Sequence, residues 1–114
     1  MDDVTDRPRA RLDVSSGPGG ELRVELSGEL DIATLPDVAG AADALLDQPP
    51  QPLVLQLGEL RFLDSSGVTL LVRIANHFGK VRTSSATAPV RRVLEVLGLA
   101  GRLGLDGGTD VDGS

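Results

Sequence analysis

Apolar and polar residues alternate in two short stretches near the start of the chain. Residues 10–14 and 22–27 both place an apolar side chain at every second position, which is the period of a half-buried β-strand. The segment between them, residues 15–20, consists of Ser, Gly and Pro, the residue types that form turns. The pattern predicts an antiparallel hairpin with one face against a core and the other in water.

The rest of the chain predicts helices that alternate with strands. Apolar residues recur at helical spacing over residues 35–47, 65–78 and 89–97. Residues 53–57 form a short apolar run that is typical of a buried strand, and residues 80–84 form a weaker strand candidate. The order strand, helix, strand implies parallel pairing with right-handed crossovers.

These elements predict an α/β fold in one domain, because 114 residues are too few for two well-packed cores. We expect a mixed sheet of four to five strands, an antiparallel N-terminal hairpin plus parallel strands, with three or more helices. Thr34 is placed to cap the first helix, and residues 102–105 are expected to add an edge strand. We expect residues 1–8 to be a loose leader and residues 106–114 to be an acidic, Gly-rich, disordered tail.

Charge and composition narrow the class of function. The net charge is -6 and the only aromatic residues are two Phe, which argues against direct nucleic-acid binding. The chain has no Cys and no apolar run long enough to cross a bilayer, so we expect a cytoplasmic protein that does not engage a membrane. The charge is uneven, since residues 61–105 carry seven bases and only two acids.

Residues for catalysis are scarce. A hydrolase or transferase needs a nucleophile with a base, a pair of carboxylates or a set of metal ligands, and the chain has one His and no Cys. His77 lies near the end of a predicted helix, where a surface role suits it. We therefore expect no enzyme activity, no metal and no cofactor.

Two short segments are candidates for a functional site. The first consists of Gly28, Glu29, Leu30 and Asp31, and the second of Asp64, Ser65, Ser66 and Gly67. Both are predicted to be loops at the carboxyl ends of strands, where open α/β sheets place their binding sites, so we expect them to be neighbours. Asp and Ser are also common N-caps, which is the ordinary structural interpretation of the second segment.

Three motifs in order give a resemblance to a known family. Residues 28–31 before a helix, the segment FLDSSGV at 62–68 and the segment APVRRVLEVLGL at 88–99 resemble the sulfate transporter and anti-sigma factor antagonist (STAS) domain family, over roughly residues 9–105. The chain is most similar to stand-alone bacterial anti-sigma factor antagonists. The resemblance implies a STAS-like fold and a protein that binds an anti-sigma factor, usually a serine kinase, and thereby releases a sigma factor.

The same resemblance implies a switch. The serine directly after the Asp is the phosphorylation site of the family, which falls on Ser65, with Ser66 as the alternative; a PP2C-type phosphatase would reverse the modification. Both segments named above would then contact the partner. Two other functions stay open: a STAS subunit of a lipid-transport ABC complex that docks on an ATPase, and a nucleotide-binding sensor that uses Arg61, Arg91 and Arg92.

Overall fold

Four strands and three helices make up the described part of the chain, residues 9–105 of a computed structural model. The expected leader, residues 1–8, and the expected tail, residues 106–114, lie outside the described residues. The elements in chain order are β1 (Ala10–Ser16), β2 (Leu22–Leu30), α2 (Leu35–Leu46), β3 (Leu53–Leu63), α3 (Ser65–Phe78), β4 (Val81–Ala86) and α4 (Ala88–Val96).

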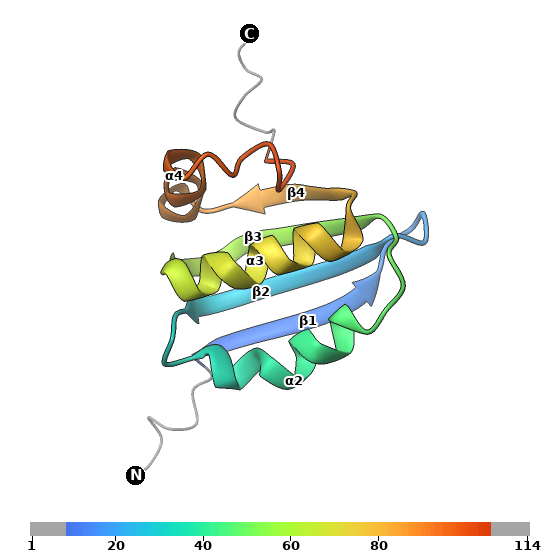
Figure 1. Cartoon of the computed structure of the whole chain (residues 1–114), viewed down its shortest axis with the longest axis horizontal. Coiled ribbons are helices and arrows are strands. Elements are labelled where there is room, and N and C mark those ends of the chain that lie inside the picture. Colours follow the sequence, from blue (N-terminus) through green and yellow to red (C-terminus); the bar gives the residue numbers. More distant parts are fainter. Residues whose placement is uncertain (1–8, 106–114) are drawn as a thin grey trace, which may run out of the picture.

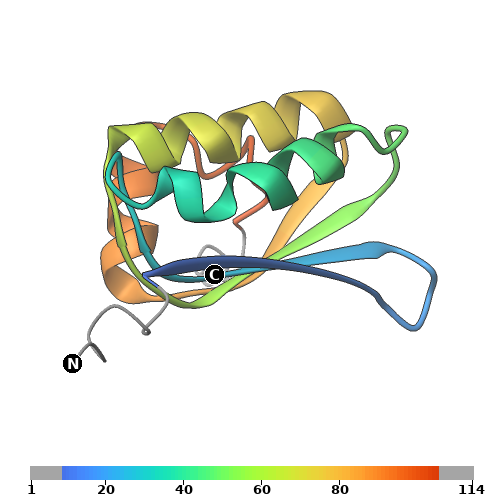
Figure 2. The same ribbon diagram turned by 90° about the horizontal axis from the view of Figure 1, so that it is seen from below.

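The strands form one sheet in the order β1-β2-β3-β4. β1 pairs with β2 antiparallel, and β2–β3 and β3–β4 are parallel, so the mixed sheet with an N-terminal hairpin is confirmed with four strands. Helices α2 and α3 lie side by side on one face of the sheet, and α4 lies next to β4 at the end where α3 begins (Figure 1). Within residues 9–105, no helix covers the opposite face of the sheet over β1 and β2 (Figure 2).

The core lies between the sheet and the two parallel helices. In β2, Leu22, Val24 and Leu26 are buried against the helices while the alternate residues face outward, as the period of two requires. Leu71 and Ile74 of α3 are fully buried from the opposite side. Each such side chain contributes about 1.5–3 kcal/mol through removal from water. An apolar core of this kind fixes which ends of the strands and helices come together.

Strands β2 and β3 are longer than the alternation predicted. β2 continues to Leu30 and β3 to Leu63, so these residues end strands and do not lie in loops. The β2–β3 register shifts twice on the way, the second time just after Gly28, whose φ is 90°. Each shift adds one residue on β3, which breaks the period of two in that strand after Leu57. β2 keeps its period through Leu30, but Gly28 occupies an inward position without an apolar side chain. The pattern therefore suggested strand ends three to six residues too early.

The predicted edge strand at residues 102–105 is wrong. This segment is a turn, in which Gly104 has a φ of 63° that strand residues do not adopt. It still covers the edge of β4, because the Thr83 N–H donates to the Gly104 carbonyl at 3.1 Å and the Thr83 hydroxyl donates to the Leu103 carbonyl at 2.7 Å. Leu103 and Leu105 are buried, which explains why their alternation resembles that of a strand.

Candidate functional site

The ends of β2 and β3 lie side by side, and this brings the two singled-out segments together. Leu30 pairs with Leu63, and the Asp64 N–H donates to the Leu30 carbonyl at 3.1 Å. Gly67, in the first turn of α3, packs directly on the same carbonyl: a Cβ added there would lie 2.7 Å from the Leu30 oxygen. The expectation that the segments are neighbours is therefore confirmed.

The Asp64 carboxylate links the two segments. Its Oδ1 accepts from the backbone N–H groups of Ser66 at 2.8 Å and Gly67 at 3.1 Å, which makes Asp64 the N-cap of α3. Its Oδ2 accepts from the Ile32 N–H at 3.2 Å, across to the loop after β2. Asp64 thus satisfies donors from two different loops, and its charge faces backbone N–H groups of both.

Asp31 and Thr34 hold the loop after β2 in a fixed shape. The Asp31 carboxylate accepts from the N–H groups of Ala33 at 2.9 Å and Thr34 at 3.0 Å. Thr34 is buried, and its hydroxyl donates to the Glu29 carbonyl at 2.6 Å. The sequence pattern placed Thr34 correctly as the N-cap residue of α2, but its side chain caps no helical N–H. The Thr34 side chain instead stabilises the loop through its hydrogen bond to the Glu29 carbonyl.

Ser65 and Ser66 differ in accessibility. Ser65 is the first residue of α3 and is exposed, whereas Ser66 is half-buried and lines a groove between α3 and α2. Among residues 9–105, the Ser65 hydroxyl has no hydrogen-bond partner. A modifying enzyme that approaches the start of α3 would therefore meet Ser65 with a free hydroxyl, at a position that the Asp64 cap holds rigidly.

Two large apolar side chains are exposed in the segments that adjoin Asp64 and Ser65. Ile32 is 73% exposed and Phe62 is 49% exposed. Ile32 is tied to Asp64 by its N–H, and Phe62 lies two residues before it, on β3, where it pairs with Glu29. Exposed apolar side chains that surround a polar centre are typical of protein-binding surfaces. Sequence reasoning did not single out Ile32, although an isolated large apolar residue in a polar turn is a signal of this kind.

The described residues place neither a metal site nor the histidine next to Ser65. Among the described residues, no three side chains of His, Cys, Asp or Glu gather as a metal site. His77 lies at the opposite end of α3, about 18 Å from Ser65 at 1.5 Å per residue, and its Nε2 is 2.7 Å from the Gln48 carbonyl. His77 therefore holds the loop after α2 and cannot serve as a base for Ser65. No helix within residues 9–105 is long and apolar enough to span a bilayer.

Comparisons with known proteins agree with this geometry. The family model described as "Mlab, STAS domain" matches residues 14–105. The chain is 26% identical to an anti-sigma factor antagonist from Mycobacterium paratuberculosis, with a TM-score of 0.70 over 81% of this chain and 80% of that one.

The fold also resembles the anti-sigma factor antagonist SpoIIAA. In its unphosphorylated form the identity is 23% and the TM-score 0.61, over 80% of this chain and 84% of that one. For the Bacillus cell fate determinant SpoIIAA in its phosphorylated form the identity is 18% and the TM-score 0.58, over 80% of this chain and 86% of that one. The sheet order, the paired strand ends and the family match lead to one conclusion: the chain belongs to the STAS domain family and has the fold of the anti-sigma factor antagonists.

Proposed function

We propose that the protein is a non-enzymatic, cytoplasmic regulator of transcription that works as an anti-sigma factor antagonist. In its unphosphorylated form it binds an anti-sigma factor that is a serine kinase, and so releases a sigma factor. The kinase then phosphorylates Ser65 and dissociates, and a PP2C-type phosphatase restores the active form. The observation that carries the proposal is the exposed hydroxyl of Ser65 at the capped start of α3, for which residues 9–105 supply no hydrogen-bond partner.

The surroundings of Ser65 support a protein partner rather than a small ligand. Ile32 in the loop after β2 and Phe62 near the end of β3 are exposed apolar side chains, and Glu29, which pairs with Phe62 across the strands, forms an exposed ion pair with Arg61 at 3.9 Å. The partner surface is thus expected to include Gly28, Glu29, Leu30 and Asp31 together with Asp64, Ser65, Ser66 and Gly67. Within this set Leu30 and Gly67 are buried, so they shape the surface from beneath.

A phosphate on Ser65 would change binding more than folding. The modification adds about -1.5 to -2 charges at the start of a helix, where the free N–H groups favour an anion. The fold therefore tolerates it. A partner that packs around a neutral hydroxyl would have to bury that charge next to Asp64, which costs several kcal/mol and lowers affinity by a few orders of magnitude. Phosphorylation would then act as a switch without a large conformational change.

The direct test is phosphate transfer from ATP by the cognate anti-sigma kinase, read by mass spectrometry. The Ser65 oxygen forms a bond to the γ-phosphorus as the bond to ADP breaks, and the hydroxyl proton is released. We expect modification of the unaltered chain and of Ser66→Ala, and none of Ser65→Ala. Phosphate on Ser66 alone, or transfer to Ser65→Ala at an unchanged rate, would contradict the assignment.

Binding measurements separate this function from the alternatives. Ser65→Ala should bind the anti-sigma factor constitutively and Ser65→Asp weakly, while Ser66→Ala serves as the matched control. Specific binding to an ABC transporter ATPase, unaffected by ATP and without phosphate transfer, would favour the role as a transport subunit instead. Saturable shifts of the amides around Arg61, Arg91 and Arg92 on addition of ATP or GTP alone would favour a nucleotide sensor.

A further inference from the structure

A groove runs between α2 and α3 on the outer side of the helix layer. Its walls are formed by residues one helical turn apart, with Leu35, Ala39 and Asp43 on α2 and Ser66, Leu70 and Arg73 on α3. The small side chain of Ala39 leaves the space open. One end of the groove lies at Ser66, next to the exposed Ser65, and the other lies two turns further along, between Asp43 and Arg73.

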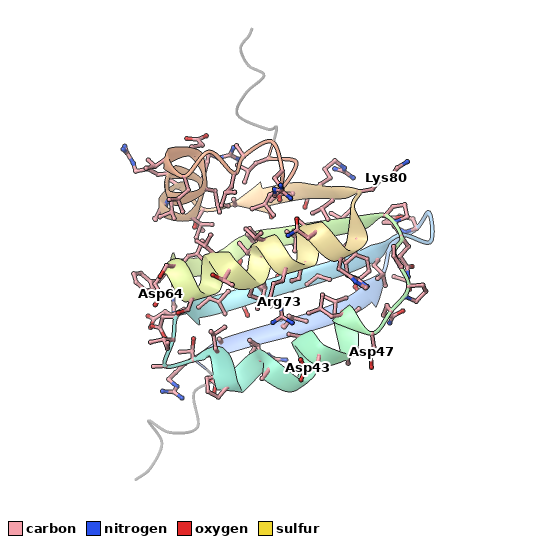
Figure 3. All side chains as sticks on the ribbon, in the orientation of Figure 1. Asp43, Asp47, Asp64, Arg73 and Lys80 are labelled. Atoms are coloured by element: carbon pink, nitrogen blue, oxygen red, sulfur yellow. The ribbon has the colours of Figure 1, made fainter. Side chains whose placement is uncertain are left out.

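The two walls of the groove carry opposite charges. The acids of α2 are Asp37 and Asp43, with Asp47 as its C-cap, and the helix has no base; α3 carries Arg73 and has no acid. The Arg73 side chain extends from α3 toward α2, on which Asp43 lies (Figure 3). Both residues are exposed, and they form no ion pair within residues 9–105. The groove therefore presents an unpaired acid and an unpaired base on its two sides.

The volume of the groove indicates what kind of group can bind in it. Its volume is about 200 Å³, below the roughly 300–1,000 Å³ of pockets that hold small metabolites. This space suits one or two aliphatic side chains. Two parallel helices also offer ridges between which a third helix can pack, the usual way in which proteins take up an amphipathic helix.

We propose that the groove between α2 and α3 is a second docking site, for an amphipathic helical segment of a protein partner. The segment places an apolar stripe between Ala39 and Leu70, a basic residue against Asp43 and an acidic residue against Arg73. Because reversal of the helix exchanges its two flanks, the opposite charges of the walls also fix the direction in which the segment lies. The proposal does not depend on phosphorylation of Ser65, and its test uses no kinase.

The test is an NMR titration of the labelled full chain with three helical peptides of about 18 residues, a length that sustains a helix. All three share a Leu stripe, and their flanks carry Lys on one side and Glu on the other, Lys on both, or Glu on both. We expect the mixed peptide to shift the amides of Ala39, Thr69 and Leu70 and to bind about three- to tenfold more tightly than the other two.

Substitutions that reverse a charge in the groove should change which of the three peptides binds most tightly. Asp43→Arg places a base on each side of the groove at the Arg73 end, so the variant should prefer the peptide with Glu on both flanks. Arg73→Glu places an acid on each side there and should prefer Lys on both flanks. Glu59→Arg, an exposed reversal on strand β3, is the matched control and should leave the order unchanged. Equal affinity for all three peptides, or shifts elsewhere than in the groove, would overturn the proposal. Shifts of these amides by hexanoate but by no peptide would also overturn it, in favour of a small-molecule site.

Discussion

The Asp64 carboxylate is the most sensitive point of the site, because three backbone donors from two loops converge on it. Replacing Asp64 with Ala removes the N-cap of α3, which costs about 1 kcal/mol. It also removes the bond from the Ile32 N–H to a charged acceptor. Such bonds contribute about 1.5–3 kcal/mol, and the exposure of Ile32 keeps this one near the lower end of the range. Together, the two losses should lower the free energy of unfolding of Asp64→Ala by about 2–3 kcal/mol.

Asp64→Ser separates the two contributions. The Ser side chain can still cap the helix but is too short for its hydroxyl to reach the Ile32 N–H. The free energy of unfolding of this variant should therefore fall by only about 1–1.5 kcal/mol. Since the chain has no Trp and no Tyr, urea unfolding is best followed by far-UV circular dichroism. The midpoint for Asp64→Ala should fall by about 1–2 M.

Hydrogen exchange gives the local readout. The Ile32 amide should exchange about tenfold faster in both variants, because each loses the acceptor on Asp64. A loss of stability below about 0.5 kcal/mol for Asp64→Ala would refute the reasoning. So would an unchanged exchange rate at Ile32, because it would mean that the carboxylate does not connect the two loops.

Four further substitutions test local packing, at Gly67 within the site and at Gly40 and Thr83 outside it. Gly67→Ala should destabilise the fold by about 2 kcal/mol or more in urea unfolding, because its Cβ would meet the Leu30 carbonyl at 2.7 Å. Gly40→Ala, the same change in an exposed helix interior with no atom within 4 Å, should instead stabilise by about 0.5–1 kcal/mol, and a destabilisation there would contradict the helix as described. Thr83→Val should lower the free energy of unfolding by about 1–3 kcal/mol, since the Leu103 carbonyl loses the buried hydroxyl that donates to it. Thr83→Ser retains the hydroxyl and is the control. An equal loss in both variants would show that the hydrogen bond is not the cause.

The sequence predicted correctly those elements in which apolar residues recur at a regular spacing. The hairpin and the three helices follow from apolar spacing, and the buried side chains of β2 are those that alternation selects. The end of β3 was missed because two extra residues, opposite the stretch of β2 around Gly28, break its period. The end of β2 was missed because Gly28 interrupts the row of apolar side chains at an inward position. Residues 102–105 were assigned to a strand because Leu103 and Leu105 are buried at alternate positions, although Gly104 turns the backbone between them.

The site was predictable only in part. Asp64 and Ser65 follow from helix capping and from the resemblance to a family, and their nearness to residues 28–31 follows from strand order. The bond from Ile32 to Asp64 has no sequence signature, because a backbone N–H is the same at every non-proline residue. The groove beside Ser66 likewise arises from how two helices are spaced on the sheet, which no local pattern specifies.

The strand order has a consequence for how the molecule forms. Each strand pairs with the one that precedes it in the chain, so the sheet can grow from β1 to β4 in the direction of synthesis. The steps close first a hairpin turn and then the two crossovers that contain α2 and α3. The contacts described for the start of α3 lie within residues 28–69. They are the Asp64 N–H on the Leu30 carbonyl, the Ile32 N–H on the Asp64 carboxylate, the Asp64 cap and the Thr69 hydroxyl on the Ser65 carbonyl. The surface around Ser65 can therefore take shape on the ribosome before β4 and α4 have been made.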